Sequence, residues 1–218
     1  MRVPAFFTIV CVAGLVALVL SERIGSRLGR YITKPTASAA FILTAFALGA
    51  TDRSYGGWIL AGLILGAAGD VALMFEGERA FLAGLGTFLL GHVAYVIAFA
   101  AVTPYQAWAT PLALVPVAGA AAVTYWLWPH LGSMRIPVLC YVAVITLMAI
   151  GALSAQTDAR ALLDATHARL LTAGAILFFA SDVFVAREKF VAGGCSNRAW
   201  GLPAYYGGQL LLAWSVAR

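Results

Sequence analysis

The chain consists mainly of long apolar runs separated by short polar segments. Of its 218 residues, 62% are hydrophobic and only 11% are charged, whereas soluble domains carry roughly 25% charged residues. A helix that spans a bilayer needs about 20 mostly apolar residues. Runs near this length cover Val3–Leu20, Thr36–Ala50, Gly57–Phe75, Phe81–Val102, Trp108–Trp128, Ile136–Ser154, Ala168–Ala186 and Leu202–Ala217. We therefore predict an all-α, polytopic membrane helix bundle of about eight transmembrane helices, forming one domain over residues 1–218.

The loop charges predict how the bundle is oriented. Basic residues are favoured on the cytoplasmic side of a membrane. The loops that follow odd-numbered spans hold most of them, namely Arg23, Arg27, Arg30, Lys34, Arg79, Arg135, Arg187, Lys189 and Arg198. The other side holds Arg2, Arg53, Arg160, Arg169 and Arg218. We therefore expect both termini on the non-cytoplasmic side, and we interpret the net charge of +5 as contact with the lipid bilayer rather than with nucleic acid.

The cysteines and histidines do not form a pattern typical of a disulfide framework or a metal site. The sequence contains no close cysteine pair, its three cysteines being Cys11, Cys140 and Cys195. His130 and His167 fall in loops predicted to lie on opposite sides, so neither can join His92 in one zinc site. We expect no metal and no cofactor.

Two aspartates lie inside apolar spans, where an ionised side chain is costly and marks a functional-site hypothesis. Asp70 lies in GLILGAAGDVALMF (62–75) and Asp182 in GAILFFASDVFVA (174–186), and the two segments also share several aligned apolar and small residues. Both spans are odd-numbered and run in the same direction. A parallel repeat of four helices plus four, or convergence on one local need, would explain the match.

Position along the predicted spans places these polar groups in one half of the membrane. Asp70 lies about 7 Å, and Asp182 about 6 Å, below the cytoplasmic edge at 1.5 Å per helical residue. Tyr205, Tyr206 and Gln209 fall within roughly the first 10 Å of the last span, with spacings that let all three project toward one side. We therefore expect the two aspartates to meet near the cytoplasmic face.

The deeper part of this half is aromatic. His92 lies about 15 Å below the same edge, on a helical stripe with Phe88, Tyr95 and Phe99. Lys34 is expected at the mouth, on the loop side of the second span. A pocket that is polar at its mouth and apolar below fits an amphiphile.

Each of these residues also has a structural explanation. Asp70 and Lys34 can form an ion pair without further function, and His92 can be a satisfied core histidine. Tyr205 and Tyr206 can belong to an interfacial aromatic belt. Ser181, next to Asp182, is a weak nucleophile candidate, because it points about 100° away from Asp182 on a helix. No serine of the chain sits in a G-x-S-x-G turn, which argues against a serine esterase.

The chain resembles the YhhN-like family of eight-helix membrane proteins. The resemblance extends from about residue 34 to 212 and rests on the order and spacing of several short motifs. These are Lys34-Pro35 opening the second span, Gly69-Asp70, the run Phe81, Gly84, Phe88, His92, Tyr95, then Gly174 with Phe178, Ser181-Asp182, and Tyr205-Tyr206 with Gln209.

The resemblance implies a function. The characterised members are lysoplasmalogenases, so it implies a multi-pass enzyme, in a bacterial inner membrane, that hydrolyses the vinyl ether of a lysophospholipid (lysoplasmalogen) substrate. The expected products are a fatty aldehyde and glycerophosphocholine or glycerophosphoethanolamine. The site is expected to open toward the cytoplasm.

Vinyl ether hydrolysis needs an acid that still holds its proton and a carboxylate that activates water, as in glycosidases. Two carboxyl groups in one apolar site cannot both ionise easily, so one stays protonated. We expect Asp70 and Asp182 to divide these roles, with Lys34, His92, Tyr95, Tyr205, Tyr206 and Gln209 binding substrate or supporting them. The rival interpretations are a carrier of a small amphiphile or of protons that uses the same aspartates, and a structural or lipid-sensing protein without turnover.

Overall fold

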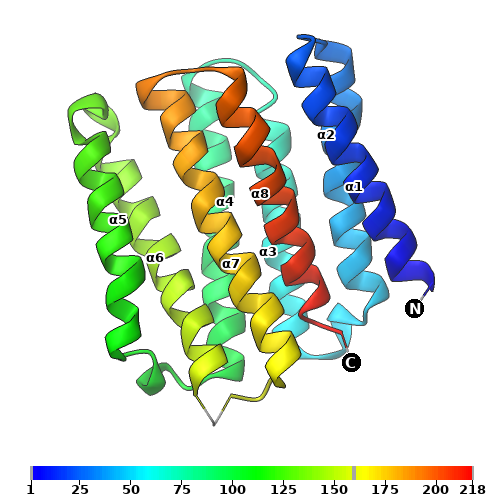
Figure 1. Ribbon diagram of the computed structural model, residues 1–218, viewed down its shortest axis with the longest axis vertical. Coiled ribbons are helices and arrows are strands. Elements are labelled where there is room, and N and C mark those ends of the chain that lie inside the picture. The colour runs from blue at the N-terminus through cyan, green and yellow to red at the C-terminus, as the bar shows by residue number, and fades with distance from the viewer. Residues whose placement is uncertain (1, 159–160, 218) are drawn as a thin grey trace.

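The computed structural model describes residues 2–158 and 161–217, and this part of the chain is mostly helical, with no strands (Figure 1). It confirms the predicted all-α, eight-helix class. The helices are α1 (Arg2–Arg23), α2 (Arg27–Ala47), α3 (Ser54–Ala72), α4 (Glu78–Val102), α5 (Leu114–Leu127), α6 (Arg135–Thr157), α7 (Ala165–Ala186) and α8 (Cys195–Trp214).

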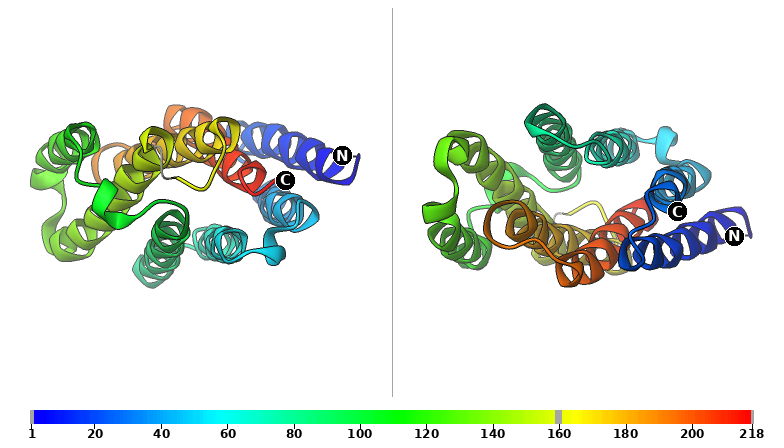
Figure 2. Two further views of the ribbon diagram at one scale, coloured as in Figure 1. Left: turned by 90° about the horizontal axis from the view of Figure 1, so that it is seen from below. Right: turned by 90° about the horizontal axis from the view of Figure 1, so that it is seen from above.

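The helices form an elongated bundle rather than a round one. Seen along the helix axes, α1 and α2 lie at one end and α5 and α6 at the other (Figure 2). Between them, the α3–α4 hairpin faces the α7–α8 hairpin, and α8 also packs against α1 and α2. The start of α1 and the end of α8 lie at the same end of the bundle (Figure 1).

Within residues 2–158 and 161–217, six helical segments are long and apolar enough to cross a membrane. They contain α1, α3, α4, α5, α6 and α7. The other two, α2 and α8, have 21 and 20 residues, and at 1.5 Å per residue both reach about 30 Å. Their N-terminal parts are polar, with Arg27, Arg30 and Lys34 in the first eight residues of α2, and Asn197 and Arg198 in the first turn of α8.

The boundaries of α2 and α8 differ from the predicted spans. We expected Lys34-Pro35 to open the second helix, but α2 begins at Arg27 and Pro35 lies inside it. The Ser26 hydroxyl caps α2 by accepting the Gly29 N–H at 3.1 Å. Likewise α8 begins at Cys195 rather than at Leu202. A search for apolar runs misses the first turns of both helices because their side chains are polar.

The fifth helix is shorter than the predicted span. Short 3₁₀ turns at Tyr105–Ala107 and Pro111–Ala113 precede α5. Thr110 precedes a proline and takes an extended conformation, with φ −109° and ψ 159°, because the proline ring disfavours the helical conformation of the residue before it. At the other end of the bundle, α7 continues into a π-helical segment, Arg187–Val191.

The membrane orientation remains a prediction from loop charge. Two of the arginines that entered it, Arg160 and Arg218, lie outside the described residues. Both of these arginines were counted on the non-cytoplasmic side. The nine basic residues of the odd-to-even loops all lie in the described part, at the end of the bundle opposite the start of α1 and the end of α8.

Cysteine labelling tests this orientation. Cys195 is exposed at the start of α8, Cys140 is exposed along α6, and Cys11 is buried. In a Cys140→Ala background, a membrane-impermeant maleimide is expected to label Cys195 only after the cytoplasmic side is opened. A Tyr105→Cys, Cys195→Ala, Cys140→Ala variant places its thiol in the exposed α4–α5 loop and is expected to react in intact cells. The reverse labelling pattern would overturn the predicted orientation.

Candidate active site

A cavity of about 390 Å³ opens among the ends of the helices, and side chains from all eight helices line it. Its volume lies in the range of small-molecule sites. The lining is mostly apolar, with side chains such as Leu85, Ile145 and Phe179. Its charged members include Glu22, Arg30, Glu188 and Arg198, which lie near helix ends and form the part that we call the mouth. Asp70 and Asp182 both line this cavity. The sequence-predicted groups from α3 and α7 therefore share one site.

Asp70 is held by side chains from two other helices. It is 3% exposed, and Lys34 Nζ of α2 lies 3.3 Å from its Oδ1. The hydroxyls of Ser38 (α2) and Tyr205 (α8) donate to its Oδ2 at 2.7 and 2.8 Å. A cation and two hydroxyl donors together stabilise the ionised form of a carboxylate.

Behind these first contacts, a hydrogen-bond chain supports Tyr205. Tyr95 of α4 donates to Gln209 Oε1 at 2.6 Å, and Gln209 Nε2 donates to the Tyr205 oxygen at 3.2 Å. Each donor in this chain points toward Asp70. Such a chain polarises its members in the same direction, so its outermost tyrosine on α4 also favours an anion at the aspartate.

A second contact supports Ser38. Its oxygen lies 3.2 Å from the Tyr206 hydroxyl. Ser38 has only one hydroxyl hydrogen, so when it donates to Asp70, Tyr206 is the donor in this pair. The Lys34 carbonyl oxygen is a second acceptor for both hydroxyls, at 3.0 Å from the Ser38 oxygen and 3.3 Å from the Tyr206 oxygen, so both side chains also contact the backbone of α2.

Asp182 has different surroundings. The Tyr141 hydroxyl of α6 donates to its Oδ2 at 2.7 Å, and His92 Nε2 lies 3.7 Å from the same oxygen. His92 is fully buried, and among the described residues neither of its ring nitrogens makes a well-formed hydrogen bond. Its ring packs against Phe178 and Tyr141, with centroids 4.5 and 5.2 Å apart. A buried imidazole in an aromatic cage is stable as the neutral form.

Aromatic rings connect the two carboxylate environments. Phe178 contacts His92 on one side and Tyr205, at 5.3 Å between centroids, on the other. Phe88 packs edge-on against Phe178 and Tyr205, at 6.2 and 5.7 Å. These rings keep the space between the polar groups apolar.

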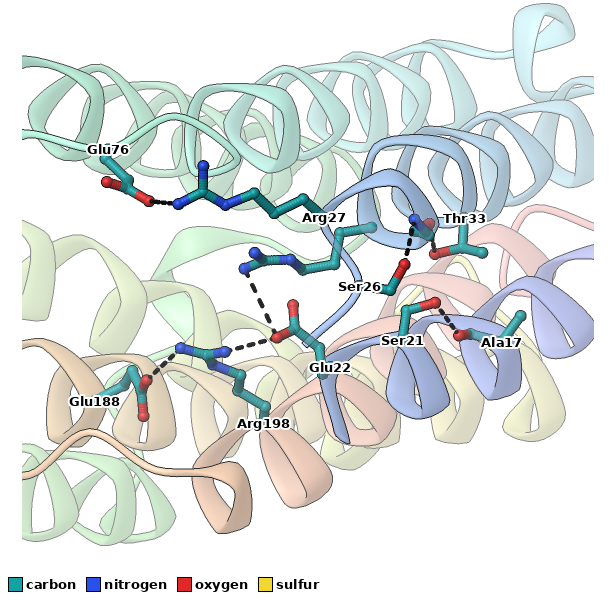
Figure 3. A network of polar contacts seen from close by, with 11 residues as sticks. Ala17, Ser21, Glu22, Ser26, Arg27, Thr33, Glu76, Glu188 and Arg198 are labelled. Atoms are coloured by element: carbon teal, nitrogen blue, oxygen red, sulfur yellow. Dashed lines mark hydrogen bonds and ion pairs between the residues drawn. The ribbon is translucent and has the colours of Figure 1, made fainter. Parts of the chain in front are cut away.

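The mouth carries a chain of alternating charges (Figure 3). Arg198 donates to Glu22 Oε2 at 2.6 Å and to Glu188 Oε1 at 2.9 Å. Arg30 lies 3.9 Å from the same Glu22 oxygen. Figure 3 also shows the separate pair of Arg27 and Glu76, which is 73% and 90% exposed and does not line the cavity.

Comparison with known proteins identifies the family. The YhhN family matches residues 29–216. This chain belongs to the YhhN family. It is 32% identical over 180 residues to proteins named lysoplasmalogenase from Mycobacterium bovis and Mycobacterium tuberculosis, covering 78% of this chain and 63% of theirs. It is also 32% identical over 159 residues to the lysoplasmalogenase TMEM86A of Bos taurus, covering 72% of this chain and 64% of that protein. The chain thus spans a little under two thirds of the length of these relatives. No solved structure matches it.

In this YhhN family member, only some of the predicted site residues reach the cavity. Lys34 and Tyr205 line it together with the two aspartates. Four others, which lie behind this wall as supporting groups, are His92, Tyr95, Tyr206 and Gln209. Tyr205 and Tyr206 are buried, so their interpretation as an interfacial belt is wrong.

Two residues that contact the aspartates, Ser38 and Tyr141, were not predicted from the sequence. Ser38 lies one helical turn after Lys34, and recognising that α2 starts before Lys34 would have placed both on one face. Tyr141 is an isolated tyrosine in an apolar helix and carries no pattern that singles it out. Among the described residues, no group of three or more His, Cys, Asp or Glu side chains is placed to hold a metal ion.

The Lys34–Asp70 pair is expected to be important for stability. Replacing one partner of a buried ion pair leaves an uncompensated charge and typically costs about 3–5 kcal/mol. We expect Lys34→Met to lower the thermal unfolding temperature strongly, and the double variant Lys34→Met, Asp70→Asn to recover part of the loss. Thermal unfolding in detergent micelles measures both.

The exposed pair on the same face provides the control. Arg27→Met should change stability by at most about 1 kcal/mol, as is usual for solvent-exposed ion pairs. A Lys34→Met protein as stable as the Arg27→Met protein would show that the buried pair contributes nothing.

Proposed function

We propose that this protein is a membrane-embedded lysoplasmalogenase that hydrolyses the vinyl ether bond of a lysophospholipid. The single observation that carries the proposal is that two carboxylates with unlike surroundings line one cavity, which is charged at its mouth and apolar inside. The family membership and the names of the relatives agree with it.

The unlike surroundings suggest which aspartate holds the proton. Asp70 has Lys34 at 3.3 Å and two hydroxyl donors, so we assign it as the ionised base. The contacts of Asp182 in the described part of the chain are one tyrosine and a histidine in an aromatic cage, so we assign it as the acid. Pairs of titratable groups whose environments differ in this way typically divide acid and base roles.

The first step is proton transfer to carbon. Asp182 gives its proton to the vinyl carbon distal to the ether oxygen, and the double bond supplies the electron pair for the new C–H bond. The adjacent carbon becomes an oxocarbenium ion. The anionic Asp70 stabilises this cation, and the aromatic rings between the carboxylates exclude bulk water from it.

Water then completes the reaction. Asp70 takes a proton from a water molecule while the water oxygen bonds to the cationic carbon, and the product is a hemiacetal. In the collapse of this hemiacetal, Asp182 accepts its hydroxyl proton while Asp70 returns a proton to the leaving glycerol oxygen. The C–O bond breaks, the products are a fatty aldehyde and a glycerophospho-headgroup, and both aspartates regain their starting states.

The other polar residues act as positioning groups. Lys34, Tyr205 and Ser38 fix the base, and Tyr95, Gln209 and Tyr206 orient those donors. Tyr141 positions Asp182, and the His92 ring packs beside Asp182 and excludes water from that side. We infer that the cavity opens toward the cytoplasm, as the loop charges predict.

Conservative aspartate variants test the mechanism. Asp70→Asn and Asp182→Asn each preserve shape but remove a proton acceptor or donor, so we expect aldehyde release from lysoplasmalogen to fall at least about 100-fold in each, the scale of general acid–base catalysis. Aldehyde release by purified protein is the measurement, with an ester lysophospholipid as the substrate control.

Asp164→Asn is the matched control. Asp164 caps α7 at the opposite end of the bundle, where the His167 backbone N–H, hydrogen-bonded to its carboxylate, holds the pKa of Asp164 below its usual value. Asparagine is also a good N-cap, so activity should be unchanged. Near-normal turnover in either site variant would refute the two-carboxylate mechanism, and lipid or proton transport without aldehyde release would favour a carrier.

A further inference from the structure

We propose that the charged mouth of the cavity is a binding site for a zwitterionic phospholipid headgroup, with the phosphate on Arg30 and Arg198 and the amine on Glu22 and Glu188. The placement of the lipid chain in the cavity below rests on the proposed function. The headgroup class is the one that the family resemblance already implies, and the new inference is which four side chains bind it.

The four side chains are accessible from the cavity, although they are paired with one another. All four line it, and the exposed fraction of their side chains ranges from 14% for Glu22 to 42% for Arg198. They come from α1, α2, α8 and the π-helical segment after α7. Such partly solvated pairs can exchange partners with a charged headgroup at little cost.

Three residues on one face of α2 indicate how far the phosphate lies from the vinyl ether bond. Arg30, Lys34 and Ser38 are spaced four residues apart, so each lies about 6 Å further along the helix than the one before. Ser38 and Lys34 contact Asp70. Three glycerol carbons separate the sn-1 ether oxygen from the phosphate oxygen, which is roughly one such helical step. A vinyl ether beside Asp70 therefore brings the phosphate to the level of Arg30.

The arginines have donors to spare. Arg30 makes the longest contact of the network, at 3.9 Å, and Arg198 uses two of its five N–H donors on the glutamates. Arginine presents its remaining donors in a planar fork that suits a phosphate. A phosphate that bridges the two arginines would weaken their ion pairs with Glu22 and Glu188.

With their arginines engaged by the phosphate, Glu22 and Glu188 need another cation, and the amine of the headgroup supplies it. Glu188 is fixed in place, because its Oε2 accepts the Gly194 N–H at 2.8 Å and the Asn197 amide at 2.7 Å. Asn197 is buried and also bonds Arg187. Choline or ethanolamine would balance the two carboxylates, whereas a phosphoglycerol headgroup has no positive charge to offer. The network thus selects zwitterionic over anionic headgroups.

Equilibrium binding tests this assignment without relying on catalysis. The probes are saturated 1-O-alkyl lysophospholipids, which lack the vinyl double bond, with ethanolamine, choline or glycerol headgroups. We expect the detergent-purified protein to bind the ethanolamine and choline lipids about tenfold more tightly than the glycerol lipid. Glu22→Gln and, independently, Glu188→Gln should reduce this ratio to about two or less. Arg30→Gln should weaken binding of all three.

The matched control is Glu76→Gln, which changes an exposed glutamate on the same face outside the cavity and should leave the ratio unchanged. Chain-free sn-glycero-3-phosphoethanolamine, as competitor, should displace the lipid weakly, because it lacks the apolar contacts. Equal binding of the three headgroups by the unmodified protein, or an unchanged ratio in both glutamate variants, would overturn the headgroup site. Loss of aldehyde release with an intact preference would instead overturn only the proposed reaction.

Discussion

The arrangement of the helices around the site depends on one requirement, which is that a carboxylate inside an apolar bundle must find a cation and hydrogen-bond donors. Asp70 meets it with contacts from α2 and α8, and the tyrosine–glutamine chain extends the contact to α4. Gly66 of α3 makes the approach possible, because a side chain there would collide with the Gln209 amide. Four helices are thus held in register by the partners of a single side chain.

The two aspartates occupy similar sequence segments but different chemical surroundings. In each segment the aspartate lies near the cavity end of its helix, yet one meets a lysine and the other a tyrosine and a caged histidine. The difference comes from the neighbouring helices and not from the segments themselves. Similar local sequences therefore provide two carboxyl groups with unlike surroundings, which is the arrangement that the proposed division into an acid and a base needs.

The helical class and the two aspartates could be predicted because both depend on local composition, namely apolar runs and a rare charge within each. The early start of α2 could not be predicted in this way, since Arg27 and Arg30 look like loop residues until the Ser26 cap is seen. The role of Tyr141 depends on which face of α6 packs toward α7, which apolar periodicity does not define in a helix that is hydrophobic all round. Likewise, the charge network at the mouth joins residues far apart in the chain, such as Glu22 and Arg198.

The contrast between the charged mouth and the apolar inner wall has a consequence for what happens after bond cleavage. Under the proposed reaction, the bond that breaks lies at the boundary between these two regions. The fragment with the headgroup is then freely water-soluble and sits next to the aqueous exit, while the long-chain aldehyde remains among apolar side chains. The two fragments would leave into different phases, one into water and one into the lipid, so their separation would oppose the reverse reaction without any further movement of the protein.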